Sequence, residues 1–397
     1  MAAGGLAAST VSGVLIGWFG PAACYLMAAP FAGAIMWPAS RNYLEERRGP
    51  GCCRPDLAKW RGKGLVPFLL AFVMGAAGVC LAFVSVYASS LRQKFLAAVF
   101  VGLLNLLLFS TFLRPSIARI NAFFFLQNVF HVGTHGASFY FFTDTAAQFP
   151  GGPHLSAFFY VTVIGTVGSL FNLLGMLCYN WFLKQWRYRS VLVMGSLTHS
   201  VVQCVSAIVY LRWNLEVSIP DPLFMVASSA TQHAISQLSW MPMTVMLAQL
   251  VPEGLESTLY ALLAGSLNLG GAVASYAGAF LLQELGVNPS GQDAEGHQFD
   301  NLWVAALISA LGPCVPLLLV GWLIPEARQT ERLLTDGDPS SATVGSLFQR
   351  WLGGGYSEFQ EDDELREERD DAGLKTSSGE RPHSEGAEMI GKSQWNK

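Results

Sequence analysis

The 397-residue chain is too apolar and too poor in charge for a soluble globular domain. Hydrophobic residues make up 52% of it and charged residues only 13%, against roughly 25% charged residues in soluble domains, and its mean hydropathy is +0.37. Residues 326–397 hold 16 acidic and 9 basic residues, a net charge of −7, which leaves +3 for residues 1–325. The sequence therefore predicts a membrane body followed by an acidic tail.

Apolar runs long enough to cross a bilayer recur along the chain. The first 18 residues predict a short or incomplete membrane helix, and residues 21–38 predict a complete one. Eight further runs predict helices over 64–89, 95–113, 117–143, 157–183, 190–212, 222–250, 256–285 and 301–324. The pattern indicates an all-α polytopic membrane protein with about nine or ten transmembrane helices.

The loops between these runs predict the orientation, because Lys and Arg concentrate on the cytosolic side of membrane proteins. Residues 41–63 carry seven bases and predict a basic cytosolic loop. The connections 144–156 and 286–300 contain no Lys or Arg and are expected outside. Residues 326–397 then form a cytosolic tail, which we expect to be disordered because its acidic and small polar residues cannot bury enough apolar surface.

The run 117–143 carries polar residues at helical spacing. It has no charged residue between Ile120 and Thr143. If it forms one helix, a single narrow stripe collects its polar residues, since each residue turns the helix by about 100°. The stripe consists of Asn121, Asn128, His131, His135 and Ser138. Lipid cannot satisfy Asn or His, so the stripe is expected to face protein or a water-filled cavity.

Three later runs repeat this pattern with neutral polar groups. The faces consist of Thr162, Ser169 and Asn172; of Ser196, His199, Gln203 and Ser206; and of Ser229, Gln232, His233, Ser236 and Trp240. One interpretation is hydrogen bonding between membrane helices. The other is a shared cavity that binds a polar, largely uncharged group and stacks a flat ring on Phe or Trp. The first is favoured for any single residue and the second for the set together.

The sequence contains no motif for a metal site or an enzyme. His131 and His135 are four residues apart, but no Glu follows His131 as in the zinc-protease pattern, and no nucleophile is paired with a base. Five of the seven cysteines lie in apolar runs. Cys52 and Cys53 are expected to be free thiols, with palmitoylation as the alternative. We expect no cofactor and no nucleic-acid partner.

Acidic residues near the predicted membrane boundaries are candidates for function. Asp221 precedes Pro222 and suits a helix start, and Glu256 lies in a first helical turn, where the helix dipole favours an acid. A structural role is favoured for both. Asp144 closes the run 117–143, where the dipole disfavours a carboxylate. A functional and a structural role are therefore equally open for Asp144.

Several segments resemble the folate–biopterin transporter family of the major facilitator superfamily, and its protozoan branch most closely. The longest is ASFYFFTDTAAQFPGGPHLSAFFYVTVIGTVGSLFNLLGMLCYN at 137–180. Shorter ones follow in family order: SIPDPLF at 218–224, SQLSWMP at 236–242, VPEGLESTLYALLAGSLNLG at 251–270, FDNLWVAALI at 299–308 and WLIPEARQTERLL at 322–334. The clear resemblance covers 117–334, and 13–48 resemble the end of the family's first half.

The resemblance implies a facilitator-type helical bundle that transports folates or pterins such as biopterin by alternating access, often with protons. It divides the chain into a remnant of the N-terminal helical half (1–40), the basic loop, two additional transmembrane helices (64–113), a six-helix C-terminal bundle (114–325) and the tail. Since facilitators bind substrate between two halves, the chain is expected to be a truncated variant or a partial gene model.

The candidate site combines the polar faces with the family-like positions. Candidate substrate-binding residues are Asn128, His131, His135, Asp144, Asn172, His233, Gln237, Trp240 and Asn268. Candidate coupling or gating residues are Asp144, Asp221 and Glu256. The expected partners are the folate or pterin, a proton and the lipid bilayer, in a plasma or organelle membrane. Two alternatives stay open: a transporter of another small heteroaromatic solute, and a non-transporting membrane scaffold.

Overall fold

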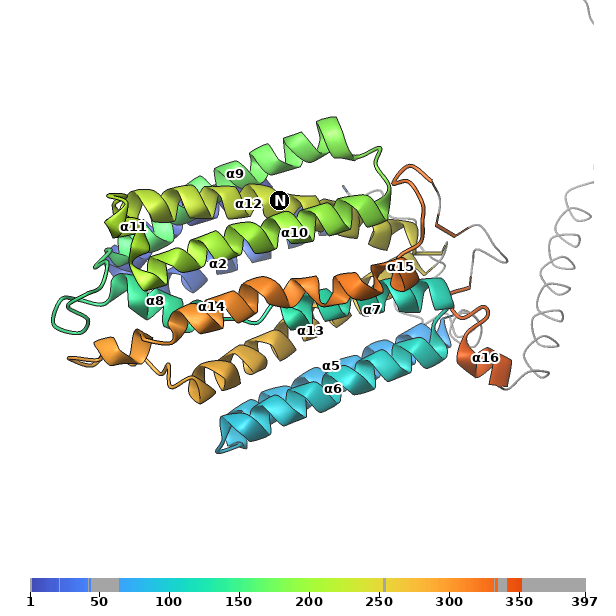
Figure 1. Ribbon diagram of the computed structural model, residues 1–397. Coiled ribbons are helices and arrows are strands. Elements are labelled where there is room, and N and C mark those ends of the chain that lie inside the picture. The colour runs from blue at the N-terminus through green and yellow to red at the C-terminus, as the bar shows by residue number, and fades with distance from the viewer. Residues whose placement is uncertain are drawn as a thin grey trace, which may run out of the picture. The chain divides into compact units, whose positions relative to one another are not determined.

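The computed structural model describes residues 2–20, 22–41, 43, 64–252, 255–331, 333–334 and 341–351, and every named element within them is a helix (Figure 1). This agrees with the predicted all-α architecture. The chain divides into two compact units, Met1–Leu347 and Phe348–Lys397. All the features below belong to the first unit, and most of the predicted loop 41–63 lies outside the described residues.

The N-terminal helices are α1 (Ala2–Phe19), α2 (Ala22–Ala34) and α3 (Met36–Ser40). Gly20, with φ 78°, ends α1 in the left-handed conformation that glycine adopts without strain. The α1 helix packs against α9 (Ile164–Cys178) through hydroxyl pairs, of which Ser9 and Ser169 are 3.2 Å apart. The N-terminal segment is therefore part of the helical body.

The two additional helices of residues 64–113 form the hairpin of α5 (Leu65–Tyr87) and α6 (Leu91–Phe112), which lie side by side (Figure 1). The Ser90 side chain begins α6 by accepting a hydrogen bond from the Gln93 N–H at 3.2 Å. Both helices pack against α13 (Glu256–Glu284). Their bounds agree with the predicted runs to within a few residues.

The predicted single helix over 117–143 is wrong. The chain forms α7 (Pro115–Phe130), leaves helical geometry at residues 131–134, and resumes as α8 (His135–Thr143). The Gly133 N–H donates to the Ala274 carbonyl of α13 at 3.3 Å, and the Ser309 hydroxyl donates to the Val132 carbonyl at 2.6 Å. These partners satisfy main-chain groups that lipid would leave unpaired. Because the helix is interrupted, its polar residues do not share one stripe.

The remaining helices follow the other predicted runs. They are η1 (Phe159–Val163), α9 and η2 (Tyr179–Leu183) in one run; α10 (Tyr188–Ser206) and η3 (Ala207–Leu211); α11 (Trp213–Glu216); α12 (Asp221–Gln249); α13; η4 (Gly296–Phe299); and α14 (Leu302–Leu311), η5 (Gly312–Cys314), η6 (Pro316–Leu319) and α15 (Val320–Leu323). The last group corresponds to the predicted helix 301–324. Pro313 and Pro316 lack an N–H, which interrupts the α-helical pattern there.

Six helical segments of the described chain are long and apolar enough to cross a membrane. They are Leu65–Tyr87, Leu91–Phe112, Phe159–Leu183, Tyr188–Leu211, Glu256–Glu284 and Gly296–Leu323. The predicted total of nine or ten also counted α1, α2, α7 with α8, and α12. The apolar segments of α1 and α2 are shorter, and the run of α7 and α8 is interrupted. At 29 residues α12 is long enough to cross a membrane, but it carries a polar face.

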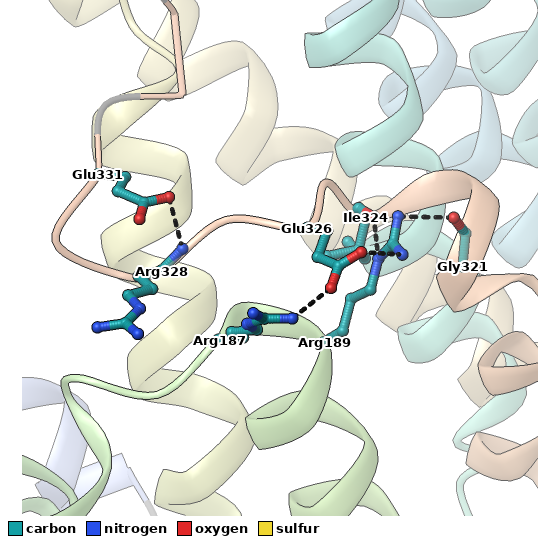
Figure 2. A network of polar contacts seen from close by, with 7 residues as sticks. All are labelled: Arg187, Arg189, Gly321, Ile324, Glu326, Arg328 and Glu331. Atoms are coloured by element: carbon teal, nitrogen blue, oxygen red, sulfur yellow. Dashed lines mark hydrogen bonds and ion pairs between the residues drawn. The ribbon is translucent and has the colours of Figure 1, made fainter.

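The start of the predicted tail is packed rather than free. Figure 2 shows Glu326 paired with Arg187 and Arg189, and Arg189 donating to the carbonyls of Gly321 and Ile324. Further on, Ala342 is fully buried and its carbonyl accepts the Arg114 N–H at 2.8 Å. Residues 326–331 and 341–346 thus differ from the expected disordered tail, and residues 352–397 lie outside the described chain.

Candidate functional site

A cavity of about 690 Å³ lies among α7, α9, α10 and α12. Its wall also includes Gly5 of α1 and Pro313 of η5. The polar lining residues are Gln127, Asn128, His131, Ser169, Asn172, Ser196, His199, His233, Ser236, Gln237 and Ser239. The four predicted polar runs therefore meet at one cavity, whose volume is typical of small-molecule sites.

The cavity wall is neutral and partly aromatic. Among the described residues that line it there is no Asp, Glu, Lys or Arg. Phe123, Phe124 and Trp240 contribute aromatic surface, on which a flat ring can stack. The ring of His131, in the break after α7, lies 5.7 Å from the ring of His199 on α10. Such a wall suits a polar but uncharged heteroaromatic ligand.

Two amide side chains join the helices of the cavity wall. Gln127 of α7 donates from Nε2 to the Ser196 hydroxyl of α10 at 2.9 Å. Gln237 of α12 donates from Nε2 to Oδ1 of Asn172 on α9. The same residues therefore bind neighbouring helices and line the cavity, so the two interpretations of the polar faces do not exclude each other.

Six of the nine candidate substrate-binding residues line the cavity. They are Asn128, His131, Asn172, His233, Gln237 and Trp240. His131 belongs to the break after α7, so its side chain is attached to a non-helical stretch of main chain. His233 packs closely against Gly168 of α9. A Cβ atom at position 168 would overlap the imidazole ring of His233.

The other three candidates lie elsewhere. His135 is exposed as the first residue of α8, because the break redirects the chain after His131. Asn268 is exposed on α13 and is not among the residues that line the cavity. Asp144 follows the last residue of α8, outside the cavity wall. The break in the predicted helix 117–143 explains why His135 lies away from the cavity.

Sequence reasoning missed Gln127 and Ser239 as cavity residues. Gln127 is one position from Asn128 and so lay about 100° from the predicted stripe, although a wider stripe would have included it. Asn121, which was predicted to face protein or a water-filled cavity, is fully buried within the protein, and its side-chain amide has no hydrogen-bond partner in the described structure.

Asp144 lies in a cluster formed by the connections 144–156 and 286–300. It is only 4% exposed, and its Oδ2 has no hydrogen-bond partner within the described residues. Burial raises the pKa of Asp144 to about 6, and the neighbouring Glu295 carboxylate adds to the rise, which the charge of His154 partly offsets. Asp144 is therefore a carboxyl group that takes up a proton at mildly acidic pH.

Glu295 behaves in the opposite way. Burial alone would raise its pKa, but hydrogen bonds from the main-chain N–H groups of Ser290, Gly291 and Gln292 and from the Ser290 hydroxyl lower the pKa below its usual range. The N–H of Glu295 also donates to the Gln148 carbonyl at 2.9 Å. The two connections are thus docked together around two carboxyl groups whose pKa values are shifted in opposite directions.

The remaining coupling candidates occupy helix starts. Asp221 accepts hydrogen bonds from both terminal nitrogens of Arg212, at 3.1 and 2.9 Å, and from Nδ2 of Asn214 at 2.7 Å. It is the first residue of α12, not the capping residue before it, which is Pro220. Glu256 is exposed in the first turn of α13. In the part of the chain that the structure describes, no three metal-ligating side chains gather.

Comparison with known proteins identifies a family and several relatives. The profile of the BT1 family matches residues 1–344. Probable folate-biopterin transporter 6 of Arabidopsis thaliana is 30% identical over 55% of this chain and 41% of its own length. The folate-biopterin transporter of Synechocystis is 30% identical over 48% and 40%, and Folate transporter 1 of Plasmodium falciparum is 24% identical over 42% and 31%.

The chain spans less than half the length of each of these three relatives. No solved structure matches.

Proposed function

This chain belongs to the BT1 family, and we propose on that basis that it transports folates or pterins across a membrane. It is an integral multi-pass membrane protein, with six apolar helices of sufficient length in its described part. The relatives are named as folate or folate-biopterin transporters, which favours a transporter over an enzyme.

The structural observation that carries this proposal is the neutral cavity among α7, α9, α10 and α12. A pterin is a flat bicyclic ring with hydrogen-bond donors and acceptors on its edge and no charge at neutral pH. The cavity offers aromatic surface at Trp240 and Phe123 and neutral polar groups on all four helices. Its volume of about 690 Å³ is ample for such a ring with a short side chain.

The broken helix supports transport by alternating access. Interrupted membrane helices commonly border the substrate sites of transporters, and the break at residues 131–134 places His131 in the cavity wall. The proton, as a coupling partner, is a further part of the proposal. Asp144 is the best candidate to carry it, because its pKa of about 6 permits both protonation states near neutral pH.

A second candidate function is transport of another neutral heteroaromatic solute. It is favoured by the absence of Lys and Arg among the described lining residues, because the glutamate carboxylates of folate have no cation to pair with in this wall. An uncharged purine, for example, would meet the same stacking and hydrogen-bonding groups.

Uptake of labelled biopterin, folate and adenine by cells that express the full chain distinguishes these functions. We expect saturable uptake of biopterin or folate above that of cells with an empty vector. Uptake of adenine alone would favour the second candidate. If the chain reaches the membrane and none of the three solutes enters faster than in control cells, the transport proposal is wrong.

A further inference from the structure

Two histidines from different parts of the cavity wall approach each other. His131 follows α7 and His199 lies on α10, and their ring centroids are 5.7 Å apart. Both side chains line the cavity and both are partly exposed. Within the described residues neither ring makes a hydrogen bond, and neither holds a polar atom that is enclosed without a partner. The ring nitrogens of this histidine pair are therefore accessible at the cavity.

Imidazoles are the only ionisable groups among the described residues that line the cavity. The lining includes His131, His199 and His233, but no Asp, Glu, Lys or Arg. His233 differs from the other two, because its Nδ1 contacts the Ser229 carbonyl of its own helix at 2.8 Å. Any charge that the wall acquires is consequently positive, and it arises by protonation of an imidazole, the side chain that changes its charge near neutral pH.

The described groups that face the histidine pair from neighbouring elements include no carboxyl group. The titratable ones are His135 of α8, which interacts with His131, and the thiols of Cys204 on α10 and of Cys314 on η5, which contacts Ser200 next to His199. Towards α13 and α14, the break meets Gly278 and Ser309, which do not titrate. The anion that pairs with a protonated imidazole at this site must therefore come with the ligand.

We propose that His131 and His199 form a carboxylate site, at which one imidazole takes up a proton from water as a carboxylate of a folate binds at the two rings. This inference rests on the proposed function. A carboxylate buried without a cation is costly, and the proton balances its charge. The imidazole N–H groups then donate charge-assisted hydrogen bonds to the carboxylate. Bonds of about 2.9 Å from both rings to one carboxylate group are compatible with the separation of the rings.

The consequence is a pH dependence that differs between ligands. Folate carries carboxylates and biopterin carries none, so only folate draws this proton into the cavity. When one proton binds together with a ligand, its affinity rises by up to about tenfold for each unit by which the pH falls. Protonation of Asp144 is a separate event that does not require a carboxylate on the solute. The ratio of folate affinity to biopterin affinity therefore reports on the histidine pair.

Equilibrium binding of folate and biopterin to the purified full chain at pH 6 and pH 7 tests this assignment. Calorimetry in two buffers of different ionisation enthalpy counts the protons taken up. Wild type should take up about one more proton with folate than with biopterin, and its folate-to-biopterin affinity ratio should be several-fold higher at pH 6 than at pH 7.

His131→Gln and His199→Gln keep a hydrogen-bond donor and remove the titration. Each alone should lower the affinity ratio at pH 6 roughly three- to tenfold. The double variant should lose the additional proton and the pH dependence of the ratio, whereas a purely structural role would change neither. Thermal unfolding shows which variants are folded. If the double variant does not fold, the single variants decide the matter, and an unchanged ratio in both overturns the assignment.

His297→Gln is the matched control. His297 is exposed in the connection 286–300 and does not line the cavity, so this variant should bind both ligands as wild type does. Equal proton uptake with the two ligands, an additional proton that persists in the folded double variant, or binding of biopterin without folate overturns the assignment while the proposed function stands. If folded wild type binds neither ligand, both are overturned.

Discussion

Gly278 of α13 lies directly against the main-chain carbonyl of Gly133, in the break between α7 and α8. A Cβ atom at position 278 would overlap this oxygen, and one turn earlier the Ala274 carbonyl accepts the Gly133 N–H at 3.3 Å. The close approach of the two backbones holds the non-helical segment that follows His131. It therefore positions a residue of the cavity wall.

Gly278→Ala should destabilise the protein, because neither backbone can move without disturbing the break. Overpacking of this kind costs about 1–3 kcal/mol. Thermal unfolding in detergent measures the effect, and Gly271→Ala, on the same helix with open space around it, is the control. Equal unfolding temperatures for the two variants would contradict the close packing.

The buried Asp144 predicts a pH-dependent stability. Its pKa in the folded protein, about 6, is raised from the ordinary value of 3.8. Folding therefore favours the protonated carboxyl, and its contribution is complete below about pH 4 and is lost as the pH rises through about 6. Asp144→Asn removes this titration, so the difference in unfolding temperature between wild type and variant should change between pH 4 and 6.

Glu295 and His154 interact with Asp144 and are present in both proteins, so the difference largely cancels their own contributions. The docking of the two connections is monitored in the same samples by protection from proteolysis at residues 144–156. A difference that stays constant from pH 4 to pH 7 would show that Asp144 titrates as an exposed carboxyl does.

Proton coupling through Asp144 predicts a separate effect on transport. Asp144→Asn keeps the shape of the side chain but cannot exchange a proton. Uptake by this variant should lose the pH dependence of the wild type or cease altogether, at an equal amount of surface protein. Normal uptake with an unchanged pH profile would leave Asp144 with a structural role only.

The packed segment 341–346 predicts where the chain tolerates truncation. Ala342 is fully buried, Ser346 is 1% exposed, and the Arg114 N–H donates a hydrogen bond to the Ala342 carbonyl. A chain that ends at residue 351 should unfold at nearly the wild-type temperature, whereas one that ends at residue 340 should unfold several degrees lower. Identical unfolding of the two truncations would show that the segment adds no stability.

The helices and the neutral cavity could be predicted because each depends on local pattern. Apolar runs and polar faces repeat at helical spacing, and the shared cavity that they predict is lined by Asn172, His199 and His233. The break after Phe130 could not be predicted in this way. It is stabilised by Gly278, Ser309 and Gly312, which are more than 140 residues away in sequence.

Two other features escaped prediction for similar reasons. The segment 341–346 is mostly small and polar, so no apolar run predicts its burial; Ala342 packs into the hydrophobic core, and its carbonyl accepts the N–H of Arg114, just before α7. The high pKa of Asp144 comes from its burial and from Glu295, which lies on a distant connection. In each case the decisive partner is remote in the chain.

Equilibrium binding of labelled biopterin to the purified chain, with and without a cavity-filling substitution, tests the central claim most directly. Ser236 lines the cavity from α12, and Ser236→Trp would occupy much of the space near it. We predict saturable binding by the wild type and at least a tenfold loss in the variant, with both proteins folded. Equal affinity of the two proteins, or no binding of either biopterin or folate by the wild type, would contradict the assignment of this cavity as the substrate site.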